Sequence, residues 1–155
     1  MCGISGIISK QNAFIQIDAL HRMLGAMIHR GPDGQGEYHD EQVVMGMRRL
    51  SIIDLEGGWQ PLYSEDKSLV LIVNGEIYNY LELSEELKKR GHVFATNSDC
   101  EVILHLYEEE QESCLHHLRG MFAFALLDKK KGTVFIARDR MGEKPLYLHQ
   151  TNDSL

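Results

Sequence analysis

The chain has 155 residues, of which 43% are hydrophobic and 25% charged, and its formal net charge is −7. This length suits one compact domain that folds without disulfides or a structural metal. The acidic balance argues against a nucleic acid or an anionic membrane as the main partner, and no apolar run is long enough to span a bilayer. The three cysteines, Cys2, Cys100 and Cys114, form no CxxC pair. We therefore expect no disulfide framework or zinc ribbon, and a cytoplasmic location.

The N-terminal part of the chain predicts a strand, a helix, a loop and a second strand. Residues 1–9 are apolar and read as a buried strand. Residues 17–28 carry apolar side chains at helical spacing, and this helix should stop at Gly31-Pro32. The glycines that follow predict a flexible loop up to Gly36, and residues 43–53 are rich in apolar and β-branched side chains, which favour a strand.

The middle of the chain continues with a strand and a helix. Residues 69–73 form a second apolar run of strand length, which Asn74-Gly75 is expected to end sharply. Leu83 and Leu87 anchor a helix that closes at Gly91.

The C-terminal part predicts further strands around one helix. Residues 92–96 favour a short strand, and residues 98–101 have the form of a capping box that opens a helix over Val102–Tyr107. Residues 121–128 and 133–139 predict a β-hairpin, and residues 145–149 a last strand. Paired strands at both ends, with helices between them, favour an α+β fold over a doubly wound parallel sheet.

Cys2 carries the most chemical information. Removal of the initiator methionine would leave this residue with both a thiol and a free α-amine. The amine has an unperturbed pKa of roughly 7.7–8.0, so it can act as a base near neutral pH and generate the nucleophilic thiolate. A cysteine at position two is, taken alone, more often a small buried residue of a terminal strand.

Other residues fit an amide hydrolase that acts on an α-amino acid. Asn74 and Gly75 offer a side-chain amide and an unhindered backbone N–H for a tetrahedral oxyanion, although Asn-Gly alone is more typical of a turn. Arg49 suits a substrate carboxylate, and Asp99 a substrate ammonium, with Glu76 as a further acceptor. The alternatives are a surface ion pair for Arg49 and a helix-dipole partner for Asp99.

An ordered set of motifs resembles a known family over nearly the whole chain. The motifs are MCGI at 1–4, HRGPDG at 29–34, RLSIID at 49–54, QPL at 60–62, NGEIYN at 74–79, SDCEVI at 98–103, GMFAFA at 120–125 and RDR at 138–140. Together they resemble the glutaminase domain of the glutamine-hydrolysing asparagine synthetases. These are class II amidotransferases of the N-terminal-nucleophile hydrolase superfamily. The resemblance implies a four-layer αββα sandwich of two antiparallel sheets between helix layers.

The resemblance assigns a role to each matching residue. It implies that Cys2 is the nucleophile and that Asn74 and Gly75 form the oxyanion hole. It further implies that L-glutamine is bound by Arg49, Leu50, Ser51, Ile52, Ile53, Asn74, Gly75, Glu76 and Asp99. The loop 29–36 matches a mobile loop near the site, to which we assign no catalytic role. No metal and no cofactor are expected for this domain.

The acceptor of the ammonia is open at this stage. In related N-terminal-cysteine domains the substrate arginine lies in a Thr-Arg-Trp context, whereas the run Arg49-Leu50-Ser51 favours the asparagine synthetase type. Asparagine-synthetase-like enzymes with other acceptors share this pattern. No Ser-Gly-Gly-x-Asp-Ser loop is present, so we expect residues 1–155 to be one C-terminally truncated glutaminase domain without the synthetase domain that uses ATP and Mg. A homodimer is also compatible with the resemblance.

Two other functions compete with an active glutaminase. The domain could bind glutamine or a synthetase partner without turnover, or it could be a scaffold that binds no glutamine. A metal site at Cys114, His116 and His117 lacks a second ligand pair at suitable spacing and is therefore not expected.

Overall fold

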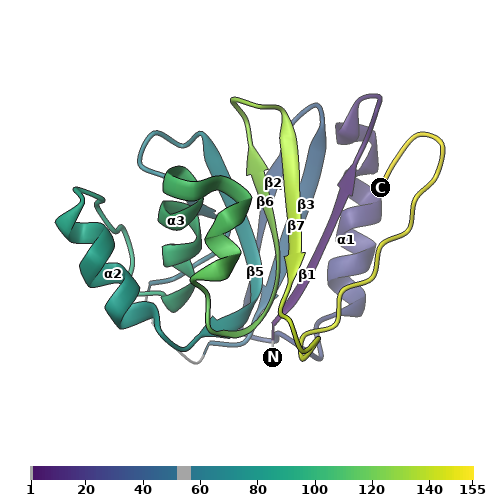
Figure 1. The fold of residues 1–155 in the computed structure, drawn as a ribbon. Coiled ribbons are helices and arrows are strands. Elements are labelled where there is room, and N and C mark those ends of the chain that lie inside the picture. Colours follow the sequence, from purple (N-terminus) through teal and green to yellow (C-terminus); the bar gives the residue numbers. More distant parts are fainter. Residues whose placement is uncertain (1, 52–56) are drawn as a thin grey trace.

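A computed structural model describes residues 2–51 and 57–155. Two antiparallel sheets face each other and carry helices on their outer faces (Figure 1). The first sheet has the order β1-β3-β2, formed by β1 (Gly3–Ile8), β2 (Gly34–His39) and β3 (Val43–Arg49). The second has the order β4-β5-β6-β7, formed by β4 (Leu62–Tyr63), β5 (Leu69–Ile77), β6 (Gly120–Asp128) and β7 (Thr133–Arg138).

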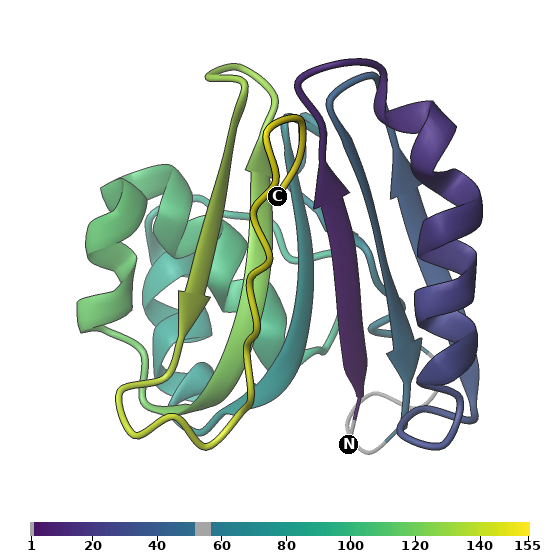
Figure 2. The same ribbon diagram turned by 90° about the vertical axis from the view of Figure 1, so that its right-hand side faces the viewer.

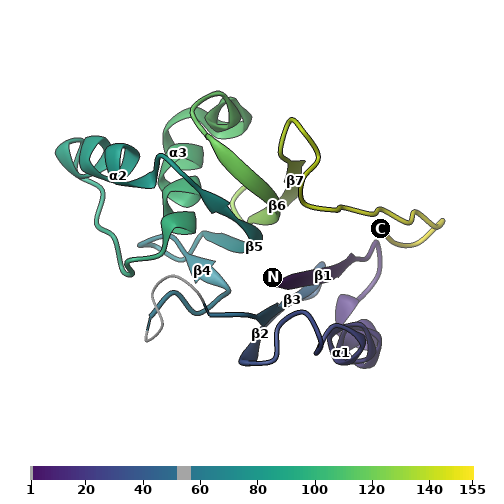
Figure 3. The same cartoon turned by 90° about the horizontal axis from the view of Figure 1, so that it is seen from below.

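Three α-helices complete the layers: α1 (Ile17–Ala26), α2 (Tyr80–Lys89) and α3 (Val102–Glu110). Short 3₁₀ helices precede or follow them: η1 (Ala13–Gln16), η2 (Asp99–Glu101) and η3 (Gln111–His116). Seen from below, α1 covers the first sheet, α3 covers the second, and α2 lies beside α3 (Figure 3). Figure 2 shows the same two sheets facing each other. The expected four-layer αββα sandwich is therefore confirmed.

Alternate side chains along each strand point to opposite faces of its sheet. In β3, Val43 and Met45 point between the sheets, whereas Val44 packs under α1 with Leu20 and Leu24. In β5, residues 70 and 72 point between the sheets, and residues 71 and 73 face α2 and α3. Both faces of these strands are covered, which explains why their sequences are almost continuously apolar.

Several predicted elements are confirmed and others are wrong. The first strand, the three helices and the hairpin of β6 and β7 lie where the sequence predicts them. The segment 34–36 is not loop but the start of β2, since its backbone pairs with β3. The expected strands at 92–96 and 145–149 do not form. The backbone N–H groups of Ala95 and Thr96 donate to the Glu101 carboxylate instead of to a neighbouring strand.

The capping box is confirmed only in part. Ser98 is the N-cap of η2, but its hydroxyl accepts from the Cys100 N–H, and the Glu101 carboxylate binds residues 95 and 96 rather than Ser98. Within residues 2–51 and 57–155, no helix is long and apolar enough to cross a membrane.

Candidate active site

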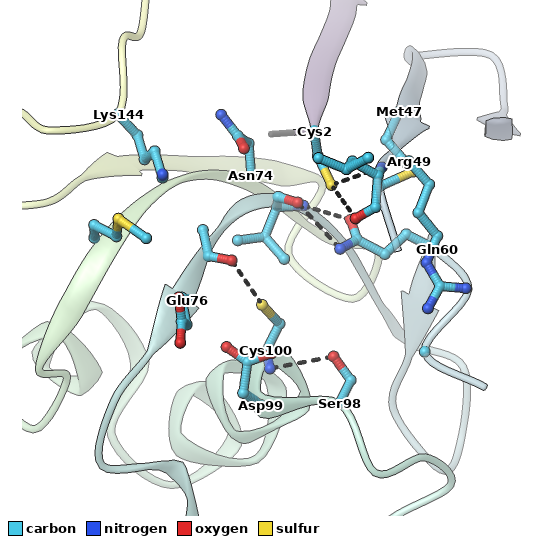
Figure 4. A pocket seen from close by; sticks show the side chains of 15 residues that line it. Cys2, Met47, Arg49, Gln60, Asn74, Glu76, Ser98, Asp99, Cys100 and Lys144 are labelled. Carbon is cyan, nitrogen blue, oxygen red and sulfur yellow. Dashed lines mark hydrogen bonds between the residues drawn. The ribbon is translucent and has the colours of Figure 1, made fainter. Parts of the chain in front are cut away.

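A cavity of about 110 Å³ lies at one end of the layer between the sheets (Figure 4). Period-two alternation explains its lining. Cys2 continues the inward-facing row of Ile4 and Ile8, and Arg49 continues that of Val43 and Met45. Asn74 and Glu76 continue the inward row of Val70 and Ile72 in β5. The apolar layer between the sheets therefore becomes polar where the strands reach this cavity.

The Cys2 thiol is held by the backbone of Leu50. Its Sγ lies 3.4 Å from the Leu50 nitrogen and 3.6 Å from the Leu50 oxygen. The neutral thiol can donate to the carbonyl, and a thiolate can accept from the N–H, so this backbone can hold the sulfur in either form. Arg30 Nε donates to the Cys2 carbonyl at 3.2 Å, so the predicted loop 29–36 fixes the backbone of the nucleophile.

Cys2 differs from the other two cysteines in its exposure. Cys100 and Cys114 are buried, whereas Cys2 is half-buried. Burial raises the pKa of the Cys100 thiol well above its ordinary value, and burial raises the pKa of Cys114 to about 12. Both therefore remain neutral thiols near pH 7 and are poor nucleophiles.

The Gly75 N–H faces the cavity, which follows from the bonds of its neighbours. Residues 73, 75 and 77 present their N–H and C=O groups on the same edge of β5. The Gln60 side-chain amide binds both the N–H and the C=O of Val73, and the Asp99 carboxylate accepts from the Ile77 N–H at 2.7 Å. The Cys100 thiol lies 4.0 Å from the Gly75 oxygen on this same edge. The Gly75 N–H therefore lies between two satisfied groups and points away from β6.

A side chain at residue 75 would not fit. A Cβ built on Gly75 would lie 2.6 Å from the Met121 oxygen and 2.8 Å from the Phe122 Cα of β6. Asn74, beside it, is only 5% exposed, and Figure 4 shows its amide on the same side of the cavity as Cys2. Asn74-Gly75 does not end the strand as expected, because β5 continues to Ile77 and pairs with β6 throughout. The two donors consequently sit on a rigid strand rather than on a turn.

Charged groups lie at several sides of the cavity. Arg49 is 4% exposed and therefore does not lie at the surface, and its guanidinium carbon lies 4.7 Å from the centre of the Trp59 ring. Asp99 is also buried, and burial raises the pKa of its carboxyl above the usual range. Glu76 lies on the side of the cavity opposite Arg49 (Figure 4). A zwitterionic amino acid needs both a cation and an acid, and this lining supplies both.

Leu50 and Ser51 are neighbours in the sequence but differ in their contact with the cavity. Leu50 lines the cavity, whereas Ser51 does not, and its N–H donates to the Asp33 carboxylate at 2.7 Å. Ile52 and Ile53 lie outside the described residues.

Several residues that line or build the site were not predicted from the sequence. Gln60 holds Val73, and Lys144 is a 4% exposed cation in the lining. The backbone of Lys144 is fixed by Asp139, whose carboxylate also accepts from the Phe122 N–H. The QPL motif contains Gln60 and the RDR motif contains Asp139. A motif alone does not show which atoms are in contact in the fold. The other missed lining residues are Met47, Gly58, Val73, Ser98, Cys100 and Met121.

Comparisons with known proteins identify the family of the chain. A family model described as a glutamine amidotransferase domain matches residues 1–155. Asparagine synthetase [glutamine-hydrolyzing] 1 of Bacillus subtilis is 46% identical over 100% of this chain and 25% of its own length. Asparagine synthetase B [glutamine-hydrolyzing] of Escherichia coli is 44% identical over 96% of this chain and 27% of its own length. The chain thus spans about a quarter of the length of these curated relatives.

Solved structures support the fold. The glutamine phosphoribosylpyrophosphate amidotransferase of B. subtilis, complexed with ADP and GMP, superposes with a TM-score of 0.75 at 23% identity. That match covers 99% of this chain and 40% of the other.

Proposed function

Because the chain belongs to the glutamine amidotransferase domain family, we propose that it hydrolyses L-glutamine to glutamate and ammonia with Cys2 as the nucleophile. The observation that carries this proposal is the convergence of the Cys2 thiol, the Asn74 amide and the Gly75 N–H on one cavity with a buried cation and a buried acid. A partly exposed thiol beside two preorganised donors is what acyl transfer requires.

Substrate binding follows from the charges around the cavity. Arg49 binds the α-carboxylate of glutamine, and Asp99 and Glu76 bind its α-ammonium. The substrate charge favours the ionised form of Asp99, which burial alone disfavours. The Leu50 backbone lies along the carbon chain of the bound glutamine. The side-chain amide of the glutamine then extends toward Cys2.

The first chemical step forms a thioester. Once Met1 is removed, the α-amine of Cys2 takes the thiol proton, directly or through a water molecule. The thiolate attacks the amide carbon, and Asn74 and Gly75 donate hydrogen bonds to the resulting oxyanion. When the tetrahedral intermediate collapses, the carbon–nitrogen bond breaks and the ammonium form of the α-amine gives its proton to the departing ammonia.

The second step releases glutamate. The α-amine, again neutral, takes a proton from water, whose oxygen attacks the thioester carbon. The same donors stabilise the second oxyanion, and the carbon–sulfur bond breaks to return the thiol. No metal or organic cofactor takes part in either step.

We further propose that the ammonia serves an ATP- and Mg-dependent synthetase domain that makes asparagine. The support is the name of the curated relatives and their much greater length. In this proposal residues 1–155 are one amidotransferase domain working in the cytoplasm, where its three free cysteines remain reduced.

The test is ammonia release from L-glutamine by a chain whose intact mass shows that Met1 has been removed. Turnover that disappears in Cys2→Ala supports the proposal. A processed chain that binds glutamine but releases no ammonia would identify a binding module instead, and one that does not bind glutamine would identify a scaffold.

A further inference from the structure

A cluster of two histidines and one glutamate lies on the outer side of the first sheet, where α1 packs beside the edge strand β2 (Figure 3). Glu37 and His39 are two residues apart on β2, so their side chains point to the same face. His21 reaches them from α1. His21 Nε2 lies 2.9 Å from Glu37 Oε2, and His39 Nε2 lies 3.0 Å from the same oxygen.

These three atoms have nearly the spacing of ligands around one ion. Zinc binds imidazole nitrogen and carboxylate oxygen at roughly 2.0–2.2 Å, so tetrahedral ligand atoms lie about 3.3 Å apart. Two of the three separations already approach this value, and all three ligand atoms lie within 4.8 Å of one another. Only a small movement of the half-exposed His21 ring is needed to complete the geometry.

Neighbouring polar groups orient the carboxylate. Gln35 Nε2 donates to Glu37 Oε1 at 3.0 Å, which directs the other oxygen, Oε2, at the two imidazoles. Arg48 in turn donates to Gln35 Oε1 at 2.8 Å and to the Gly31 carbonyl at 3.1 Å. Such outer hydrogen bonds are typical of metal sites, where they fix the direction of a ligand.

We propose that His21 Nε2, His39 Nε2 and Glu37 Oε2 bind one divalent transition-metal ion of the zinc class, with water in the remaining position. Two imidazoles and one carboxylate suit such ions better than Mg²⁺ or Ca²⁺, which prefer oxygen ligands. The ion ties α1 to the edge strand β2, on the side of the sheet opposite the glutamine cavity. Its role is therefore structural and independent of the proposed glutaminase reaction.

A second cluster, formed by Glu65, His92 and His105, is a weaker candidate. The His105 ring is enclosed between the carboxylates of Glu101 and Glu108, at 3.6 and 3.1 Å. These two acids favour a doubly protonated ring, which has no lone pair for a metal.

The test is calorimetric titration with zinc alone, in a Cys2→Ser background that removes the thiol as a competing ligand. One ion per chain is expected, and His21→Ala and His39→Ala should each weaken binding at least ~10-fold, since even the loss of an outer-shell partner costs ~10–100-fold. Zinc should also raise the Tm of the Cys2→Ser chain but not that of the double variant of His21 and His39. His116→Ala, an exposed histidine outside both clusters, is the matched control and should bind as the background does.

Three results would overturn the proposal. These are no binding of zinc to the Cys2→Ser chain, equal affinity in the double variant, and loss of binding in His92→Ala but not in His39→Ala. None of them bears on glutamine hydrolysis, because the cluster and the cavity lie on opposite faces of the sheet.

Discussion

Asn74 is a primary amide that is 5% exposed, in a row of β5 whose other members at 70 and 72 are apolar. Its role as an oxyanion donor predicts that Asn74→Ala lowers kcat by ~100–1000-fold, the usual loss for one such donor, and changes KM little. Steady-state ammonia release measures this, with Asn152→Ala as a control on an exposed asparagine. A kcat close to that of the parent would remove Asn74 from the oxyanion hole.

Asp99 combines a cost in stability with a role in binding. Burial raises its pKa, so the ionised carboxylate destabilises the fold as the pH rises above 3.8, the ordinary pKa of an aspartate. Asp99→Asn keeps an acceptor for the Ile77 N–H but no charge. We expect a free energy of unfolding at pH 7 that is higher by roughly 0.5–2 kcal/mol, together with a KM for glutamine raised ~10–100-fold. Denaturant unfolding measures the free energy and steady-state kinetics measure KM on the same sample, with Asp153→Asn as the control. Lower stability with unchanged KM would contradict the assignment.

Single site residues could be predicted from their chemistry, but the sequence did not show which other residues they contact. Cys2, Arg49, Asn74 and Asp99 are reactive or charged groups with a recognisable task, and all four line the cavity. The task of Gln60 is to bond the Val73 backbone, and this is visible only when the two segments lie together. The three metal-ligand candidates of the His21 cluster were missed for the same reason, since they come from a helix and a strand.

Helices and strands were predicted correctly where the apolar residues follow a helical spacing or form one continuous run. The helical spacing of Leu20 and Leu24, and the apolar run of β5, gave the right element type. Prediction failed where tertiary contacts override local preference. Asn74-Gly75 reads as a turn, but pairing with β6 keeps it in a strand. Residues 92–96 read as a strand, but the N–H groups of Ala95 and Thr96 donate to the Glu101 carboxylate.

The link between η2 and α3 predicts a pH-dependent stability. Burial alone would lower the pKa of His105, but the carboxylates of Glu101 and Glu108 beside the ring outweigh it and raise that pKa above 6.5. Burial likewise opposes ionisation of Glu101, but His105 and the donors of residues 95 and 96 lower the pKa of this carboxyl below 4.5. The stabilisation from His105 is present below pH 6.5 and is lost as pH rises through its raised pKa, whereas that from Glu101 is lost as pH falls through its lowered pKa.

We therefore expect Tm to fall as the pH is raised from about 6 to about 9, and His105→Gln to flatten that slope. The variant should also lose roughly 3–5 kcal/mol at pH 6, because the buried Glu101 carboxylate then has no cation beside it. Thermal unfolding over this pH range, with His116→Gln as the control, makes the measurement. An unchanged slope in His105→Gln would show that another group titrates.

At the scale of the whole molecule, the site is divided between the two sheets. Arg49 belongs to the first sheet and Cys2 directly precedes its strand β1, whereas Asn74, Gly75 and Glu76 belong to the second sheet. Their separation is set by the apolar layer formed by Val43, Met45, Val70, Ile72 and Leu127. The sequence predicted both the two sheets and the reactive residues, but the distance between the sheets depends on packing that no local pattern specifies.

Alanine substitutions at two isomeric core residues can distinguish the effect of sheet spacing on kcat from the effect of lower stability. Ile72 lies between the sheets, and Leu104 lies between the second sheet and its helices; both are at most 1% exposed. Replacing either with alanine should cost roughly 2–5 kcal/mol of unfolding free energy. Only Ile72→Ala should also lower kcat, by ~10–100-fold, because a shift of about 1 Å between nucleophile and donors is enough for such a loss. Rates measured well below the Tm of each variant decide this. If both variants keep the parent kcat, the strands alone hold the nucleophile and the oxyanion donors in place. The packing between the sheets would then have no effect on catalysis.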